Sequence, residues 1–163
     1  MMLKVSFKND FKKVETFNDK ATVVTLTGKI LCPNFMSDCL PRKVWEWINH
    51  HPSVEVSEGF TQSGLYYIIK VSGKSVCADD DTFDAKIGER IAECRTKIRI
   101  YKFMQTLTKM LCEYYHGLIF SNDVAINDTD VCSENCLLDA NLRYAKLWQH
   151  ERHHLTELLQ KTV

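Results

Sequence analysis

A long heptad pattern in the second half of the chain constrains the fold more than any other feature of the sequence. Nine positions recur there at alternating spacings of four and three residues, over about four heptads, and seven of them carry apolar or aromatic side chains. The positions are Ile87, Ile91, Cys94, Ile98, Tyr101, Gln105, Thr108, Cys112 and Tyr115. A sustained pattern of this kind predicts one long helix whose apolar seam packs against another helix.

A second apolar set joins this seam in the later part of the predicted helix. Its members are Ile100, Phe103, Met104, Leu107, Met110, Leu111 and Tyr114. We therefore expect the helix to be half-exposed at its start and buried on several sides near its end. Asp81 or Thr82 is expected to cap its first turn, and Gly117 with the polar residues 121–123 marks its exit.

A last helix is predicted to fold back on the first one, after a loop through residues 127–130. It carries apolar residues on one face, namely Leu138, Leu142, Ala145, Trp148, Leu155 and Leu159. At about 1.5 Å per residue, the first helix would span roughly 50 Å, which is more than the preceding region can cover. We therefore expect a homo-oligomer that forms through the long helices.

The region before these helices carries the signals of β-strands. Leu3, Val5 and Phe7 alternate with polar residues, which is the period of a half-buried strand. The β-branched segment 21–27 predicts a second strand, which should end in a turn at Gly28.

One short helix and two more strand segments are expected before residue 78. Pro41 suits the first turn of a helix, which we predict over residues 41–50. Strands are predicted near 54–56 and over 65–77, the latter broken by a two-residue hairpin turn at Ser72-Gly73.

These elements together predict an α+β fold. A small antiparallel sheet with a short helix is followed by two long antiparallel helices. The sequence shows no repeat and no flexible linker, so residues 1–163 are expected to form a single domain. Its β-rich part covers residues 1–78, and its long helical hairpin covers residues 82–163.

Composition narrows the classes of function. The 21 Lys and Arg residues balance the 21 Asp and Glu residues, which argues against general nucleic-acid binding and against an electrostatically held membrane protein. No apolar run approaches the roughly 20 residues of a membrane span, and the N-terminus lacks the apolar core of a signal peptide. We therefore expect a cytoplasmic protein, whose seven cysteines act as small buried hydrophobes rather than as a disulfide framework.

A basic stripe is the leading candidate for a binding site. At helical spacing Arg95, Arg99 and Lys102 share one face of the first long helix, and Lys109 lies further along it. Arginine forks suit phosphate oxygens, and Tyr101 or Phe103 is the expected stacking partner for a ring. This pattern predicts a ligand-binding site for a phosphate-containing molecule. Replacing Arg95 and Arg99 with Ala is then expected to abolish binding without unfolding the protein.

Two ordinary roles compete with this interpretation of the stripe. In the first alternative, its cations only make one side of the helix soluble and bind no ligand. In the second they pair with the segment 121–163, which carries seven acidic and four basic residues.

Two further motifs have the spacing of metal ligands. His150, Glu151 and His154 match the HExxH pattern of zinc proteases, in which two histidines one helical turn apart hold the metal. A polar helix surface is the favoured interpretation, because such a surface also carries charges at these positions. Cys132 and Cys136 supply only half of a zinc site, so plain packing is favoured there. We assign no metal, no cofactor and no catalytic residue.

The segment from Gly73 to Arg95 has a distinctive order of features. A strand ends in Cys77, an acidic turn follows, and Phe83-Asp84 then precedes a helical Gly88. This segment resembles small proteins of tailed phages and prophages. Phe83 and Ile87 are expected to pack on the sheet, and Gly88 to let the helix approach a strand closely.

The phage resemblance implies an accessory role in the host cytoplasm. In architecture, the chain is similar to anti-defence sponges of the Thoeris type, which are oligomers that sequester a cyclic-nucleotide or ADP-ribose-type signal. This implies a non-enzymatic protein that binds such a nucleotide, although no ligand residue of a sponge maps onto this chain. A protein–protein interaction module, either an inhibitor or a virion component, is the alternative. A zinc hydrolase built on HExxH is a third and less favoured interpretation.

Overall fold

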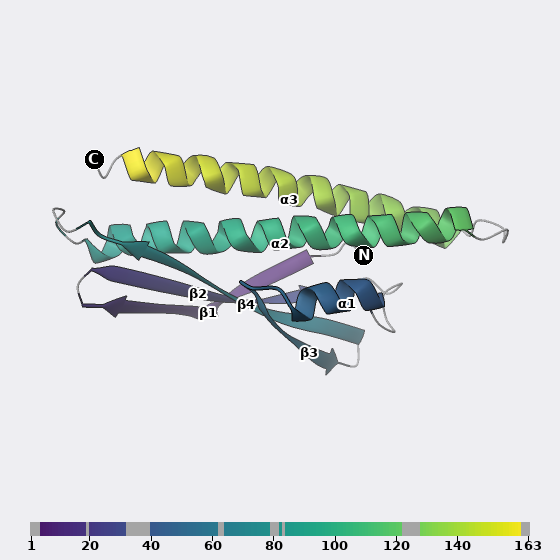
Figure 1. The fold of residues 1–163 in the computed structure, drawn as a ribbon, viewed down its shortest axis with the longest axis horizontal. Helices are drawn as coiled ribbons and strands as arrows, with labels where there is room; N and C mark the ends of the chain where they lie inside the picture. Colours follow the sequence, from purple (N-terminus) through teal and green to yellow (C-terminus); the bar gives the residue numbers. More distant parts are fainter. Residues whose placement is uncertain are drawn as a thin grey trace.

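The computed structural model describes residues 4–18, 20–31, 40–61, 64–78, 82, 84–121 and 128–160. Its elements are β1 (Lys4–Phe17), β2 (Ala21–Leu31), α1 (Arg42–Asn49), β3 (Glu55–Thr61), β4 (Gly64–Val76), α2 (Ala85–Ser121) and α3 (Asp128–Gln160). The predicted α+β architecture is confirmed: a small antiparallel sheet and a short helix precede two long antiparallel helices (Figure 1). None of the described helices combines enough length with enough apolar character to cross a bilayer.

The four strands form one antiparallel sheet in the order β1-β2-β4-β3. β2 pairs with β4 along its whole length, from Ala21 opposite Val76 to Leu31 opposite Tyr66. β3 is shorter and pairs only with the first part of β4, from Thr61 opposite Gly64 to Glu55 opposite Lys70. The last part of β4 therefore has an open edge on the side away from β2, within the described part of the chain.

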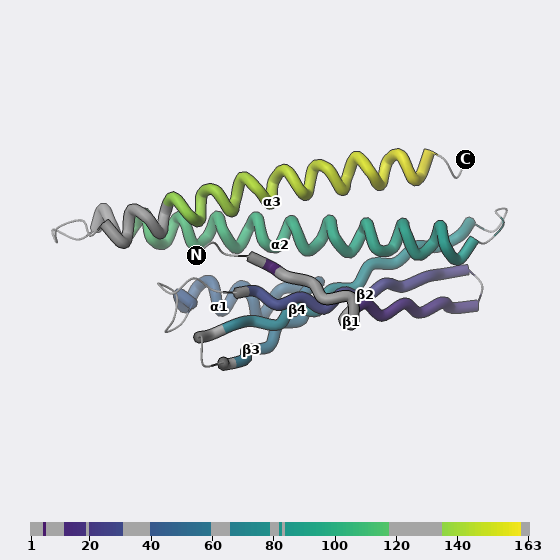
Figure 2. Tube along the Cα trace, turned by 180° about the vertical axis from the view of Figure 1, so that it is seen from behind, coloured from purple at the N-terminus to yellow at the C-terminus, as the bar shows by residue number. Residues whose placement is uncertain are grey.

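The long helices stack on one face of this sheet. α2 lies along β2 and β4, and α3 packs on the side of α2 that is turned away from the sheet (Figures 1 and 2). The short helix α1 packs beside α2, where Trp47 stacks on Phe103 with ring centroids 5.0 Å apart. α2 is thus the central element of the molecule.

The core lies between the sheet and α2. Because side chains alternate along a strand, every second residue of β2 and β4 faces the helix. The buried side chains of this layer are Val24, Leu26, Ile30, Ile69 and Val71 from the sheet, and Ala92, Ile100, Phe103, Met104, Leu107 and Leu111 from α2.

The hairpin turn predicted at Ser72-Gly73 is wrong, because β4 runs straight through both residues. Gly73 instead faces α2, where a Cβ atom would lie 2.5 Å from the Thr96 hydroxyl oxygen and would overlap the Ala92 carbonyl oxygen. The predicted turn at Gly28 is also wrong, since β2 continues to Leu31. At Gly73, close approach of a helix requires glycine, and sequence alone did not distinguish this from a turn.

The role predicted for Gly88 is confirmed. A Cβ atom on this residue of α2 would lie 2.9 Å from the Thr22 hydroxyl oxygen of β2. The Ser75 hydroxyl of β4 donates a 2.8 Å hydrogen bond to the Gly88 carbonyl oxygen. Gly73 and Gly88 therefore let the first half of α2 lie directly on the sheet.

The start of α2 differs from the prediction in its cap. Asp84 is the cap, since its carboxylate accepts hydrogen bonds from the backbone N–H groups of Lys86 at 2.8 Å and Ile87 at 3.1 Å. Thr82 lies too early for this role, and Asp81 and Phe83 lie outside the described residues. Ile87 packs against the cluster of Ile91, Cys94 and Leu158 between α2 and α3, not on the sheet as predicted.

The predicted burial of α2 is confirmed in its middle and wrong at its end: Ile100, Met104 and Leu111 of the second apolar set are fully buried, and the first turn is exposed at Ala85 and Lys86. Full burial begins earlier than predicted, since Ala92 and Thr96 are enclosed where α2 lies between the sheet and α3. Near its end Glu113, Tyr114 and His116 are exposed, since this part of α2 extends past the sheet (Figure 1).

α3 begins at Asp128, so the loop predicted over 127–130 is wrong for its last three residues, and Asn127 lies outside the described residues. The face predicted to pack is also partly wrong. Trp148 and Leu155 do turn toward α2, but Leu138, Leu142 and Leu159 are exposed. The buried residues of α3 are Leu137, Ala140, Tyr144 and Leu158.

Candidate anion-binding site

The two long helices meet along the seam that the heptad pattern predicts. Near one end, the Cys94 thiol donates to the carbonyl oxygen of Glu151 at 3.1 Å. In the middle, Tyr101 stacks on Tyr144 with ring centroids 6.3 Å apart. The thiol is not a reactive group, because burial and the Glu151 carboxylate raise its pKa to about 12.

The two polar members of the seam share one partner on α3. The Asn141 amide donates to the Gln105 carbonyl oxygen at 2.7 Å and to the Thr108 hydroxyl at 3.1 Å. A paired polar group inside an apolar seam penalises any shift of one helix along the other. This contact therefore fixes which residues of α2 and α3 lie opposite each other.

Arg95 and Arg99 of the predicted stripe reach the open edge of β4. Arg95 donates from Nη1 to the Lys74 carbonyl oxygen at 2.6 Å, and Arg99 donates from Nη1 to the Ser72 carbonyl oxygen. These carbonyl groups lie in the part of β4 that β3 does not reach. The two guanidinium groups thus protect an exposed strand edge, and their positive charges meet neutral acceptors.

The opposite flank of α2 is held by ion pairs. Lys12 of β1 lies 2.6 Å from the Glu89 carboxylate and 2.5 Å from that of Glu93, and Lys97 lies 2.8 Å from Glu93. Burial alone would raise the pKa of Glu93, but the hydrogen bonds and charges of the two lysines outweigh it and lower the pKa. The charge of Lys97, which lies between Arg95 and Arg99 in the sequence, is therefore neutralised.

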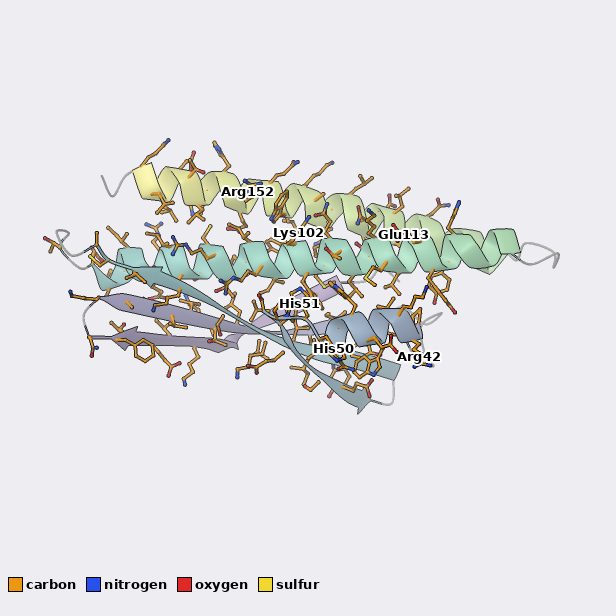
Figure 3. All side chains as sticks on the ribbon, viewed as in Figure 1. Arg42, His50, His51, Lys102, Glu113 and Arg152 are labelled. Atoms are coloured by element: carbon orange, nitrogen blue, oxygen red, sulfur yellow. The ribbon has the colours of Figure 1, made fainter. Side chains whose placement is uncertain are left out.

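Lys102 meets a second cation on the ring of Trp148. Its Nζ lies 4.9 Å from the centre of the indole, and the guanidinium carbon of Arg152 lies 4.8 Å from it. Lys102 also donates to the side-chain oxygen of Gln105 at 3.2 Å. No carboxylate of the described residues pairs with either cation. Figure 3 labels both residues, one on each long helix.

The structure separates the predicted stacking residues from the stripe. Phe103 is only 2% exposed and belongs to the core beside Trp47. Tyr101 faces Tyr144, and burial raises its pKa. The aromatic ring that accompanies the basic stripe is instead Trp148.

Sequence reasoning missed Trp148 and Arg152 as members of this site. We assigned the first to the apolar face of the last helix and the second, which lies inside the HExxH pattern, to a polar helix surface. Their spacing of four residues on a helix, which puts a guanidinium over an indole, was the available signal. The convergence of Lys102 on the same ring depends on the register of α2 and α3, which the sequence does not supply.

The HExxH motif does not assemble a metal site in the described part of the chain. His150 is exposed, whereas Glu151 turns toward Cys94 on α2. His154 lies 3.9 Å from Glu157. Within the described residues there is no group of three potential metal ligands. The Cys132 side chain lies outside the description, and Cys136 is a half-buried free thiol.

No protein-family model matches the sequence, and neither a curated protein nor a solved structure matches the chain. The function proposed below is therefore inferred from the charges, ring contacts and burial of the described residues.

Proposed function

We propose that the chain is a non-enzymatic binding protein that holds a phosphate-containing ligand between α2 and α3. The observation that carries this proposal is the pair of cations, Lys102 and Arg152, on the ring of Trp148. Two positive charges without a carboxylate partner among the described residues raise the local potential and favour a phosphate dianion.

A nucleotide fits this site better than a simple anion does. Trp148 is half-buried, and base–aromatic stacking on its ring would contribute about 1–3 kcal/mol. Arg99 lies one turn before Lys102 on α2 and uses one N–H group on the Ser72 carbonyl oxygen. Its other N–H groups are then available to a second phosphate group.

Sequestration is the role that we propose for this binding. The phage resemblance implies a protein that removes a cyclic-nucleotide or ADP-ribose-type signal from the host cytoplasm. The chain needs no catalytic group for that task. It needs only a dissociation constant for the ligand that is lower than the concentration of the signal.

Calorimetric titration tests the proposal. ADP-ribose, 3′,5′-cyclic AMP and inorganic phosphate are titrated into the wild-type protein and into the Lys102→Ala/Arg152→Ala variant. We expect the variant to bind the nucleotides at least about tenfold more weakly. A Lys43→Ala/Lys86→Ala variant, which removes two exposed lysines elsewhere, is the matched control and should bind like the wild type.

Two outcomes would overturn the proposal. One is a wild-type protein that takes up none of the three probes. The other is a Lys102→Ala/Arg152→Ala variant that binds as tightly as the control. Trp148→Leu separates stacking from charge, because it should weaken nucleotide binding and leave phosphate binding almost unchanged.

A protein–protein interaction module is the second candidate, and one observation favours it. Leu138 and Leu142 of α3 are 51% and 54% exposed, although both belong to an apolar stripe. This function predicts that the protein is indifferent to nucleotides and that the basic stripe tolerates alanine.

A further inference from the structure

α3 carries a second heptad stripe beside the face that packs on α2. Leu138 and Leu142 are one helical turn apart and more than half exposed. The positions that continue this spacing of four and three residues are Ala145, Gln149, Arg152, Thr156 and Leu159. The first part of the stripe is apolar and the rest is mostly polar, so the apolar contact centres near Leu142.

We infer that this stripe binds a second copy of the chain, with the two α3 helices antiparallel and a two-fold axis beside Leu142. In this arrangement Leu142 of one copy meets Leu142 of the other. Leu138 then meets Ala145 of the second copy, and this contact occurs twice because of the symmetry. The three apolar side chains in the first part of the stripe are covered in this way.

Charge complementarity identifies the occupant as a second copy. Asp139 lies three residues before Leu142, and Lys146 lies four residues after it, along the same side of the stripe. Both residues are exposed, and the ion pairs of the described residues include neither of them. An antiparallel pair brings Asp139 of each copy next to Lys146 of the other, whereas a parallel pair places these two residues on opposite sides of the interface, where they do not meet.

The size of the stripe predicts a weak dimer. The described part of the helix that is symmetric about Leu142, from Asn135 to Gln149, is about 22 Å long, and a face about 10 Å wide covers about 220 Å² per copy. Stable complexes bury about 800 Å² per partner. We therefore expect a dissociation constant on the order of 1–100 µM, with monomer and dimer exchanging as the concentration changes.

Sedimentation equilibrium of the full chain, over about 5–500 µM, tests the surface. We expect a monomer–dimer equilibrium in the wild type and a dissociation constant raised at least about tenfold by Leu142→Glu. Tyr114→Glu is the matched control, because it introduces the same negative charge in place of an exposed side chain of α2 that lies outside the stripe. It should dimerise like the wild type. Circular dichroism shows whether each variant remains folded.

A charge exchange tests the antiparallel register. Asp139→Lys and Lys146→Asp should each weaken the dimer, since each puts like charges side by side across the axis. The double variant restores both pairs and should dimerise like the wild type. A wild type that stays monomeric at the highest concentration, or a Leu142→Glu variant that dimerises normally, would overturn the inference. A double variant that remains weaker than both single variants would overturn the register.

Discussion

The two flanks of α2 use the same kind of side chain in different ways. On the β1 side, Lys12 and Lys97 are paired with Glu89 and Glu93. On the other side, Arg95 and Arg99 donate to backbone carbonyl groups, and Lys102 lies on an indole ring. The charge of a lysine that is paired with a carboxylate is largely cancelled by its partner. A cation that is bound to a neutral acceptor still produces a positive electrostatic potential around it. The difference indicates that one flank serves the fold and the other remains able to attract an anion.

Close packing of α2 on the sheet underlies both flanks, and removing it gives the largest expected effect. Gly73→Leu would force a side chain into the space of Ala92 and Thr96. We expect a loss of about 3 kcal/mol or more in the free energy of unfolding, measured by urea denaturation. Gly117→Ala is the control, because its Cβ meets no atom within 4 Å and a helical alanine should stabilise by about 0.5–1 kcal/mol. An equally mild effect at both glycines would contradict the close approach.

The paired flank should respond to pH and salt. Glu93→Gln removes the carboxylate that Lys12 and Lys97 share, and we expect it to cost about 1 kcal/mol of stability at pH 7 and low salt. The pKa of Glu93 is lowered in the fold, so its contribution is present above the unfolded-state pKa near 4.5 and is lost as the pH falls through the lower folded-state value.

Urea denaturation at pH 7 and at pH 3 measures this difference. The wild type should lose more stability between the two pH values than Glu93→Gln does. Added salt should narrow the gap between them at pH 7. A gap that is the same at both pH values and at high salt would show that the carboxylate charge is not involved.

Removing the arginines of the other flank should lower the free energy of unfolding by less, and this loss should depend less on salt. Arg95→Ala/Arg99→Ala removes two donors from the open edge of β4, where water can replace them. We expect a cost of about 0.5–1 kcal/mol that hardly changes with salt, together with weaker nucleotide binding. A variant that unfolds would show that the two arginines are needed for the fold, and would contradict their role in binding a ligand.

Lys102→Ala/Arg152→Ala should have the smallest effect on stability. Both side chains are exposed, and a cation over an indole at such a site contributes about 0.5–1 kcal/mol at most. Removing two like charges that converge on one ring offsets part of that loss. We expect a change below about 0.5 kcal/mol in urea denaturation, so that any loss of binding reports on the site itself. A larger loss would make this pair part of the fold.

The sequence predicts the elements of this fold better than their faces. Periodicity is a property of one segment, so the seam of α2 is readable from residues 87–115 alone. The packing face of α3 is not, because Leu138 and Leu142 form as good an apolar stripe as Leu137 and Tyr144 do. The polar contact of Asn141 with α2 decides between the two stripes, and it involves residues far apart in the chain.

The candidate site follows the same rule. The cations Arg95, Arg99 and Lys102 are readable as one stripe, because helical spacing puts them together. Their aromatic partner cannot be identified from the sequence, because nearness in sequence favours Tyr101 and Phe103. In the structure Tyr101 packs in the seam between α2 and α3, and Phe103 lies in the core. Trp148 reaches Lys102 only through the register of two helices.

Fluorine NMR of protein labelled with 5-fluorotryptophan tests the central claim most directly. The chain has three tryptophans, so three resonances are expected, and Trp148→Phe identifies the one that belongs to Trp148. We expect ADP-ribose to shift this resonance in a saturable way, to leave those of Trp45 and Trp47 in place, and to have no effect in Lys102→Ala/Arg152→Ala. A resonance of Trp148 that does not move at saturating nucleotide, or a shift confined to the two tryptophans of α1, would contradict the account.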